Sequence, residues 1–194
     1  MRKTATVAIS ICGAFILALV CTEMRTPVVT VKAEGPEVFA AGATPQNVPF
    51  VWALTNEEGD YPGYSRVEGG ALDDGTKLFI CRAGYTPGKV YKNLCLYPYA
   101  GGESTFRPGY YQVLLTNAQY QWKAEGDVTR TDIKSSAVKG GSDRDGQDTL
   151  YICRKKMDDG VHPGKYSWKN RLCYIPWGGK EYPFKGSFEI LFRN

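Results

Sequence analysis

An internal duplication constrains the fold of this chain more than any other feature of its sequence. The segment FICR at 79–82 returns as YICR at 151–154, and PGK at 87–89 returns at 163–165. The offset between matching residues grows from 70 (52 to 122) to 78 (95 to 173), and the added residues fall in glycine-rich stretches, as in a duplicated unit whose loops vary. We therefore predict two tandem repeats, at 50–117 and 118–194. Other matched pairs are Trp52 and Trp122, the Gly-Gly pairs at 69–70 and 140–141, the Asp-Gly pairs at 74–75 and 145–146, Cys95 and Cys173, and YQVL at 111–114 with FEIL at 188–191.

Each repeat is composed of short segments with the residue preferences of β-strands. The segments 77–82 and 149–154, like the segments 110–115 and 187–192, are rich in β-branched and aromatic residues. The Asp-Gly, Gly-Gly and Pro-Gly pairs predict turns, because glycine reaches positive φ without steric cost. No stretch after residue 50 carries a sustained helical period. The sequence therefore predicts an all-β fold of short antiparallel strands.

The start of the chain has the layout of a secretory signal peptide. Arg2 and Lys3 precede the apolar run ATVAISICGAFILALVC, and we expect residues 1–21 to be removed. A retained signal-anchor helix is the alternative, although this run is at the short edge of what spans a bilayer. Residues 22–49 mix proline, alanine and glycine and predict a linker or propeptide. The mature protein is therefore expected to be secreted and extracellular, without insertion into a membrane.

Removal of the signal peptide would bring the protein close to electrical neutrality. The full chain has 24 basic and 20 acidic residues, and loss of Arg2 and Lys3 lowers the formal net charge from +4 to +2. Surfaces that bind nucleic acid or an anionic membrane carry a larger excess of positive charge. We therefore expect neither of them as a partner.

Four of the six cysteines fall in the repeats, two in each. Four cysteines allow three pairings. Their matching positions favour Cys81 with Cys95 and Cys153 with Cys173, and an oxidising extracellular compartment would keep both disulfides. Buried free thiols are the alternative interpretation.

The sequence has few of the residues that metal sites and catalytic sites require. Its one histidine, His162, is placed by its neighbour Pro163 in a loop, and the chain lacks both a Cys-x-x-Cys pair and a Gly-x-Ser-x-Gly elbow. The acidic segment 143–148 lacks the spacing and the distal glutamate of a helix-loop-helix calcium site. We therefore predict no metal, no cofactor and no enzymatic activity. A pair of carboxylates acting on a glycosidic bond is the alternative that the sequence leaves open.

Two arginines and two glutamates also recur at matching positions. Arg82 and Arg154 end equivalent strands, and Glu103 and Glu181 follow equivalent glycine pairs. We predict that the arginines and the glutamates form ion pairs within or across the repeats, and we favour this structural role over contact with a ligand.

The order of these motifs resembles the DM-nine repeat. The second repeat carries GGSD at 140–143, LYICR at 150–154, PGK at 163–165 and CYIPWGGKE at 173–181. The resemblance covers residues 50–194. It implies a prism-like all-β fold in which the two repeats pack about a pseudo-two-fold axis. The family includes natterin-like proteins, and also molluscan lectins that bind mannose and act in the recognition of microbes.

The resemblance also implies site residues. In those lectins a carboxylate after the Gly-Gly pair and the lysine of Pro-Gly-Lys hold the sugar, and the matching residues are Asp143 and Lys165. A carboxylate accepts hydrogen bonds from two neighbouring hydroxyls, while an ammonium donates to their oxygens. The first repeat keeps Lys89 but has Leu72 in place of the aspartate, which leaves Asp74 as its partner in a degenerate second site. The simpler interpretation makes Asp143 a turn residue and Lys165 a solvated lysine.

We therefore predict a secreted, calcium-independent lectin for mannose-type glycans or microbial surface polysaccharides, with a role in innate immune or host-surface recognition. A single shallow site binds at about millimolar sugar, so useful affinity needs several sites, which two repeats or a homodimer would supply. The second hypothesis is an extracellular protein-binding or structural scaffold, motivated by Leu72. The third is an enzyme or toxin of natterin type, for which the sequence offers neither a nucleophile nor an added pore-forming region.

Overall fold

The computed structural model describes residues 49–54 and 61–194. The predicted signal peptide, and all but the last residue of the predicted linker, lie outside the described residues. Within them the chain forms fifteen strands, one α-helix and one 3-10 helix. In chain order these are β1 (Phe50–Leu54), β2 (Ser65–Arg66), β3 (Glu68–Ala71), β4 (Lys77–Ala83), β5 (Thr86–Tyr91), β6 (Leu94–Tyr99), β7 (Gly102–Phe106), β8 (Gln112–Thr116), β9 (Tyr120–Ala124), η1 (Glu125–Asp127), α1 (Arg130–Ser136), β10 (Lys139–Ser142), β11 (Thr149–Met157), β12 (Gly160–Ser167), β13 (Leu172–Trp177), β14 (Lys180–Phe184) and β15 (Glu189–Arg193).

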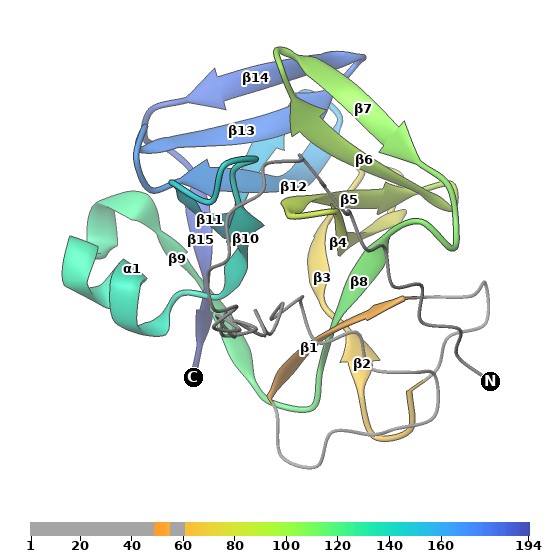
Figure 1. Cartoon of the computed structure of the whole chain (residues 1–194), viewed down its shortest axis with the longest axis horizontal. Coiled ribbons are helices and arrows are strands. Elements are labelled where there is room, and N and C mark those ends of the chain that lie inside the picture. The colour runs from red at the N-terminus through yellow and green to blue at the C-terminus, as the bar shows by residue number, and fades with distance from the viewer. Residues whose placement is uncertain (1–48, 55–60) are drawn as a thin grey trace, which may run out of the picture. The chain divides into compact units, whose positions relative to one another are not determined.

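The strands form one large, curled antiparallel sheet with a symmetric order (Figure 1). That order is β1-β8-β4-β5-β6-β7-β14-β13-β12-β11-β15-β9, with β3 beside β4, β10 beside β11 and β2 beside β8. Each strand from β1 inward to β7 has its counterpart in the other half, from β9 inward to β14. Two copies of one unit related by a pseudo-two-fold axis produce such an order. The predicted all-β fold of two tandem repeats is therefore confirmed.

The repeats meet at the centre of the sheet through two equivalent hydrogen bonds. The Glu103 N–H donates to the Gly179 carbonyl at 3.2 Å, and the Glu181 N–H donates to the Gly101 carbonyl at 3.1 Å. Each glutamate is the second residue of its strand, β7 or β14, and lies beside the turn of the other repeat. This junction also carries both glutamate side chains to the two clefts described below.

The Pro-Gly pairs and the first Gly-Gly pair of each repeat lie in strands, which corrects the prediction that they form turns. The Pro-Gly pairs lie inside β5 and β12, and the Gly-Gly pairs lie inside β3 and β10. A methyl group on Gly69 would lie 2.6 Å from Cγ of Pro163, and one on Gly140 would lie 2.6 Å from Cγ of Pro87. These glycines are needed because the strands of the two repeats approach closely. The Asp-Gly pairs do form turns, with φ of +86° at Gly75.

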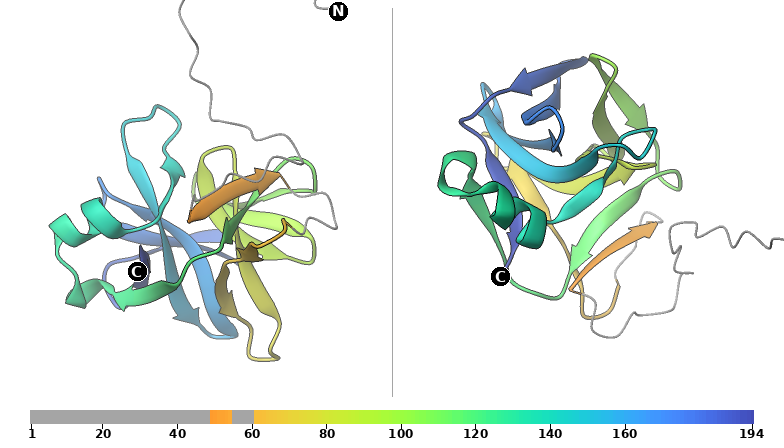
Figure 2. Two further views of the ribbon diagram at one scale, coloured as in Figure 1. Left: turned by 90° about the horizontal axis from the view of Figure 1, so that it is seen from below. Right: turned by 60° about the vertical axis from the view of Figure 1, so that its left-hand side comes forward.

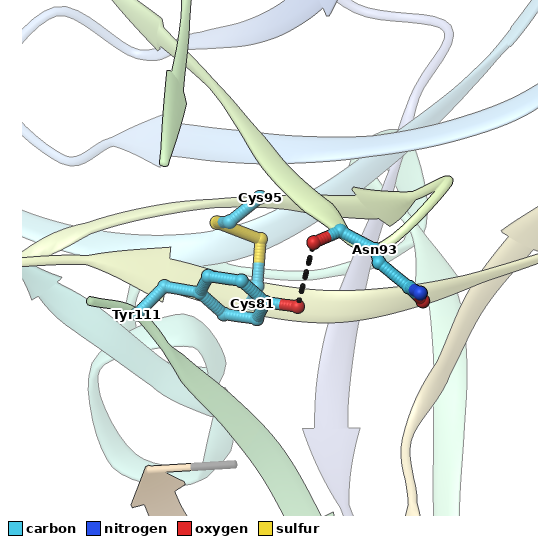
Figure 3. The surroundings of a disulfide bond; sticks show 4 residues. All are labelled: Cys81, Asn93, Cys95 and Tyr111. Carbon is cyan, nitrogen blue, oxygen red and sulfur yellow. Dashed lines mark hydrogen bonds between the residues drawn. A yellow bond between two sulfur atoms is a disulfide. The ribbon is translucent and has the colours of Figure 1, made fainter. Parts of the chain in front are cut away.

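Each repeat has a buried cluster around a disulfide, with the pairing expected from the matching positions. Cys81 and Cys95 link β4 to β6, and Cys153 and Cys173 link β11 to β13. Figure 3 shows the first disulfide beside the ring of Tyr111, whose hydroxyl donates to the backbone carbonyl of residue 93 at 3.3 Å.

A third buried cluster belongs to both repeats. Its buried aliphatic side chains come from the equivalent strands β4 and β11, from β8 and β15, and from the segments beside them: Val67, Ile80, Leu114, Val138, Ile152 and Leu191. Burial of apolar surface shared by the two halves stabilises them together. The repeats therefore share one continuous interior.

The two helical elements, η1 and α1, were not predicted from the sequence. Helix α1 contacts β15, and Figure 2 shows it beside the C-terminal strand. Thr129 and Asp132 form a capping box, in which the Asp132 N–H donates to the threonine hydroxyl at 3.2 Å and the Thr129 N–H donates to the aspartate at 2.9 Å. Seven residues are too few to show a helical period. In the described part of the chain, no helix is long and apolar enough to cross a membrane.

Candidate functional site

Two equivalent clefts lie beside the lysines of the Pro-Gly-Lys motifs. What we call the second-repeat cleft has a volume of about 340 Å³, and its lining includes Thr86, Tyr99, Asp143, Lys165, Tyr174 and Glu181. The first-repeat cleft has a volume of about 370 Å³, and its lining includes Leu72, Lys89, Leu96, Glu103, His162 and Trp177. Each cleft therefore combines side chains of both repeats.

Lys165 lines the second-repeat cleft and is held there by two contacts. Its ammonium donates to the Pro98 carbonyl at 2.7 Å and forms an ion pair with Glu181 at 2.9 Å. Only 14% of the Lys165 side chain and 10% of the Glu181 side chain are exposed. Glu181 also accepts the Gly101 N–H at 2.6 Å, so both repeats hold the pair. An ammonium has three N–H donors, and one remains for a ligand.

Asp143 lies at the edge of the same cleft, in the turn after β10. Its Oδ1 accepts the Asp148 N–H at 3.0 Å, and its carbonyl accepts the Gly146 N–H at 3.1 Å. Among the described residues, none donates a hydrogen bond to its second oxygen, Oδ2. The turn role and a ligand role are compatible, because a carboxylate accepts several hydrogen bonds.

Asp148 fixes one wall of the second-repeat cleft. It is buried, and it accepts hydrogen bonds from the Ser167 hydroxyl and, at 2.8 Å, from the Lys169 N–H. The Ser167 oxygen in turn accepts the Asn170 N–H at 2.9 Å. This network holds the turn after β12 against the turn after β10. Within residues 49–54 and 61–194, no cluster of histidine, cysteine and acidic side chains could hold a metal ion.

Lys89 is more deeply buried than its counterpart and has different partners. Its ammonium donates to the Pro176 carbonyl at 2.5 Å and to Nδ1 of His162 at 2.9 Å. Oε2 of Glu103 lies 3.7 Å from the Lys89 nitrogen, which is beyond hydrogen-bond distance. Burial lowers the pKa of Lys89, while Glu103 and Asp159 act in the opposite direction.

His162 lies in β12 and is buried, which corrects its predicted place in a loop. Its Nε2–H donates to Asp159 at 2.9 Å, and the same carboxylate oxygen accepts the Trp177 indole N–H at 2.9 Å. Burial lowers the pKa of His162, and the positive charge of Lys89 lowers it further. The neutral imidazole fits both contacts, because its Nδ1 must accept from Lys89.

The model of the DM9 repeat matches residues 84–184, which is more than half of the chain. The chain belongs to the DM9 repeat family. The matched range begins between β4 and β5 and ends with β14, so it spans the junction of the two repeats.

Among solved structures, this DM9 protein is similar to the nematode sperm cell motility protein MFP2B. The TM-score is 0.57 at 18% sequence identity, and the alignment covers 84% of this chain and 50% of MFP2B. The chain therefore spans about half the length of that protein, and at this identity the likeness concerns the fold alone. No curated protein matches the chain.

The two DM9 residues expected to hold a sugar, Asp143 and Lys165, line one cleft. The pair expected in the first repeat is not brought together in the same way. Asp74 is exposed, its carboxylate accepts the Thr76 N–H at 2.8 Å, and it is not among the residues that line the first-repeat cleft. Leu72 lines that cleft instead, at the position equivalent to Asp143.

The predicted pairing of the recurring arginines with the recurring glutamates is wrong. The glutamates face the cleft lysines, and Glu181 is a site residue that sequence reasoning did not assign to a site. The recurrence of a glutamate at the equivalent positions 103 and 181 was the sequence feature that could have indicated this role. The arginines instead bond to β8 and β15 and stack on tryptophans: Arg82 with Gln112 and Trp52, and Arg154 with Glu189 and Trp122.

Proposed function

We propose that this DM9 protein is a secreted, calcium-independent lectin that binds mannose-type glycans in the second-repeat cleft. The observation that carries this proposal is the meeting of Asp143 and Lys165 in one cleft, each with hydrogen-bonding capacity left for a ligand. A sugar presents neighbouring hydroxyls that both donate and accept. Asp143 would accept from one hydroxyl, and Lys165 would donate to the oxygen of another.

The surroundings of Lys165 support recognition of a neutral sugar without a metal ion. Glu181 and the Pro98 carbonyl fix the ammonium, so little conformational entropy is lost when a ligand binds. A divalent cation in the same cleft would lie close to this positive charge, which is unfavourable. Tyr99 lines the cleft and offers an aromatic face to a sugar ring, while the ring of Tyr174 holds the Lys165 ammonium at 5.2 Å from its centroid.

The disulfides support a role outside the cell. The described part of the chain has two of them, and disulfides persist mainly in oxidising compartments. The cleft is small and open, so we expect weak single-site binding that becomes useful on multivalent surfaces such as microbial polysaccharides. Innate immune or host-surface recognition, with a homodimer that doubles the number of sites, fits this mode of binding. We assign no enzymatic activity to the protein.

Retention of the protein on immobilised mannan, with a chelator present, tests this proposal. We expect the native protein to be retained and Asp143→Ala to bind roughly tenfold more weakly or worse, as expected for loss of a hydrogen bond to a charged group. Lys165→Ala should lose binding as well. Asp74→Ala is the matched control, because it changes an exposed turn aspartate of the other repeat, and it should bind like the native protein.

A native protein that is not retained, or an Asp143→Ala variant retained as strongly as the native protein, would contradict the proposal. That result would favour the alternative, an extracellular protein-binding or structural module. Retention on mannan that a chelator abolishes would contradict the calcium-independent mechanism.

A further inference from the structure

The two clefts are equivalent by position but differ in chemistry. Lys89 pairs with Leu96 across β5 and β6, as Lys165 pairs with Tyr174 across β12 and β13. Two residues after each lysine, Tyr91 lines the first-repeat cleft where the second-repeat cleft has a serine. One wall of the first-repeat cleft is therefore apolar where its counterpart is polar.

Leu72 likewise makes the edge of the first-repeat cleft more apolar than the equivalent edge of the second-repeat cleft. Its N–H donates to the Thr76 carbonyl at 2.9 Å and its carbonyl accepts the Gly75 N–H at 3.0 Å, which are the backbone bonds that Asp143 makes in the other repeat. The turn is thus the same, and only the side chain differs. A polyhydroxylated sugar in this cleft would leave hydroxyls facing Leu72 and Leu96 without partners, which is costly.

The base of the first-repeat cleft nevertheless keeps unused hydrogen-bonding capacity. Lys89 donates two of its three N–H groups, to Pro176 and His162. Oε2 of Glu103 is buried, and among the described residues it has no hydrogen-bond partner. The gap of 3.7 Å between these two atoms contrasts with the direct contact of 2.9 Å between Lys165 and Glu181. One hydroxyl oxygen can lie within hydrogen-bond distance of both atoms, accepting from the lysine and donating to the glutamate.

Trp177 supplies a fixed aromatic wall. Its indole N–H donates to Asp159 at 2.9 Å, and its ring packs against Tyr182 in a T-shaped contact with a centroid distance of 5.7 Å. A ring held on both sides offers a stable face for an aromatic ligand.

We propose that the first-repeat cleft is a second, separate binding site for a monocyclic aromatic ligand that carries one hydroxyl group, such as a phenol. The hydroxyl bridges Lys89 and Glu103, and the ring lies against Leu72, Leu96 and Trp177. The site does not depend on glycan binding in the second-repeat cleft.

A titration of the full-length protein with 4-methylphenol, with toluene as the matched ligand that lacks the hydroxyl, tests this inference. The readout is the NMR signal of the Trp177 indole N–H, assigned with Trp177→Phe. We expect saturable shifts with 4-methylphenol and roughly tenfold weaker binding of toluene, because toluene leaves the buried donor and acceptor unpaired. Leu72→Asp, which introduces the residue type of the equivalent position, should weaken binding of 4-methylphenol, whereas Asp143→Ala should not.

Three outcomes would overturn the inference. They are equal binding of 4-methylphenol and toluene, unchanged affinity in Leu72→Asp, and no shift of the Trp177 signal at millimolar 4-methylphenol. Failure of glycan binding would appear separately, as loss of mannan retention by the native protein, so the two proposals fail independently.

Discussion

His162 connects the two repeats at the base of the first-repeat cleft. It accepts a hydrogen bond from Lys89 of the first repeat and donates one to Asp159 of its own repeat. The two contacts together assign the neutral imidazole with its proton on Nε2, because Nδ1 must accept from Lys89. Burial and the nearby ammonium lower the pKa of His162, so its protonation opposes the folded state.

We expect the free energy of unfolding to fall as the pH drops below the ordinary histidine pKa of about 6.5. In that window the unfolded chain binds a proton at His162 and the folded chain does not, so stability rises with pH. Carboxyl groups with a lowered pKa, such as Asp159, change the free energy of unfolding only at more acidic pH, below the ordinary aspartate pKa of 3.8. The pKa of Lys89 is also lowered, so this group likewise makes the free energy of unfolding rise with pH. Its effect lies in the alkaline range, below the ordinary lysine pKa of 10.5.

Urea unfolding at about pH 5 and about pH 7.5 measures this effect. The variant His162→Thr introduces the residue type of the equivalent position, Thr86, and should lose most of the pH dependence. The same pH dependence in the variant and the native protein would assign the effect to other groups.

Among the secondary-structure elements, β3 and β10 set the distance between the repeats. Each lies across a strand of the other repeat, β12 or β5. At Gly70 a methyl group would lie 2.0 Å from the Val161 carbonyl oxygen, and at Gly141 it would lie 1.9 Å from the Tyr85 carbonyl oxygen. Backbone atoms cannot move aside as a flexible side chain can, so these positions accept only glycine.

We expect Gly70→Ala to lower the free energy of unfolding by about 1–3 kcal/mol or more, the usual cost of overpacking. Gly126→Ala is the matched control, because no atom lies within 4 Å of the added methyl group, and its effect should stay within about 0.5 kcal/mol. Denaturant unfolding of both variants measures the difference. Equal stability of the two would show that the contact between β3 and β12 is looser than described.

The same glycines show where sequence reasoning about elements reaches its limit. The duplication and the strand-like segments were enough to predict the all-β repeats and the disulfide pairing. The Pro-Gly pairs and the first Gly-Gly pair of each repeat were assigned to turns because their local preferences favour turns. Their glycines are instead required by contacts with residues far away in the sequence, such as Gly69 with Pro163, and local preference does not encode such contacts.

For the whole molecule, the shared interior implies that the repeats unfold together. Ile80 and Ile152 occupy equivalent positions in the cluster that belongs to both repeats, and both are fully buried. Truncation of either side chain removes packing that both halves use.

We therefore expect Ile80→Ala and Ile152→Ala each to lower the stability of a single, common transition by about 2–5 kcal/mol. Far-ultraviolet and near-ultraviolet circular dichroism should report the same midpoint in each variant. Two separated transitions, with only one of them shifted by each variant, would mean that the repeats are independent units.

The clefts also depend on the packing of the whole molecule. For this reason the sequence could predict only some of the residues that line them. Asp143 and Lys165 were assigned through the family resemblance, and they do line one cleft. The contact of Lys89 with His162 joins residues 73 positions apart and arises only from the pseudo-two-fold packing. The ion pair of Lys165 with Glu181 joins β12 and β14 within the second repeat, on either side of β13, so motif spacing alone could not identify it.

An NMR titration of the native protein with methyl α-mannoside is the most direct test of the proposed glycan site in the second-repeat cleft. We predict saturable shifts at Asp143, Lys165 and Glu181, little change in the Trp177 indole signal, and loss of the shifts in Asp143→Ala. Shifts confined to the first-repeat cleft, or no shifts at sugar concentrations well above millimolar, would contradict a glycan site in the second-repeat cleft.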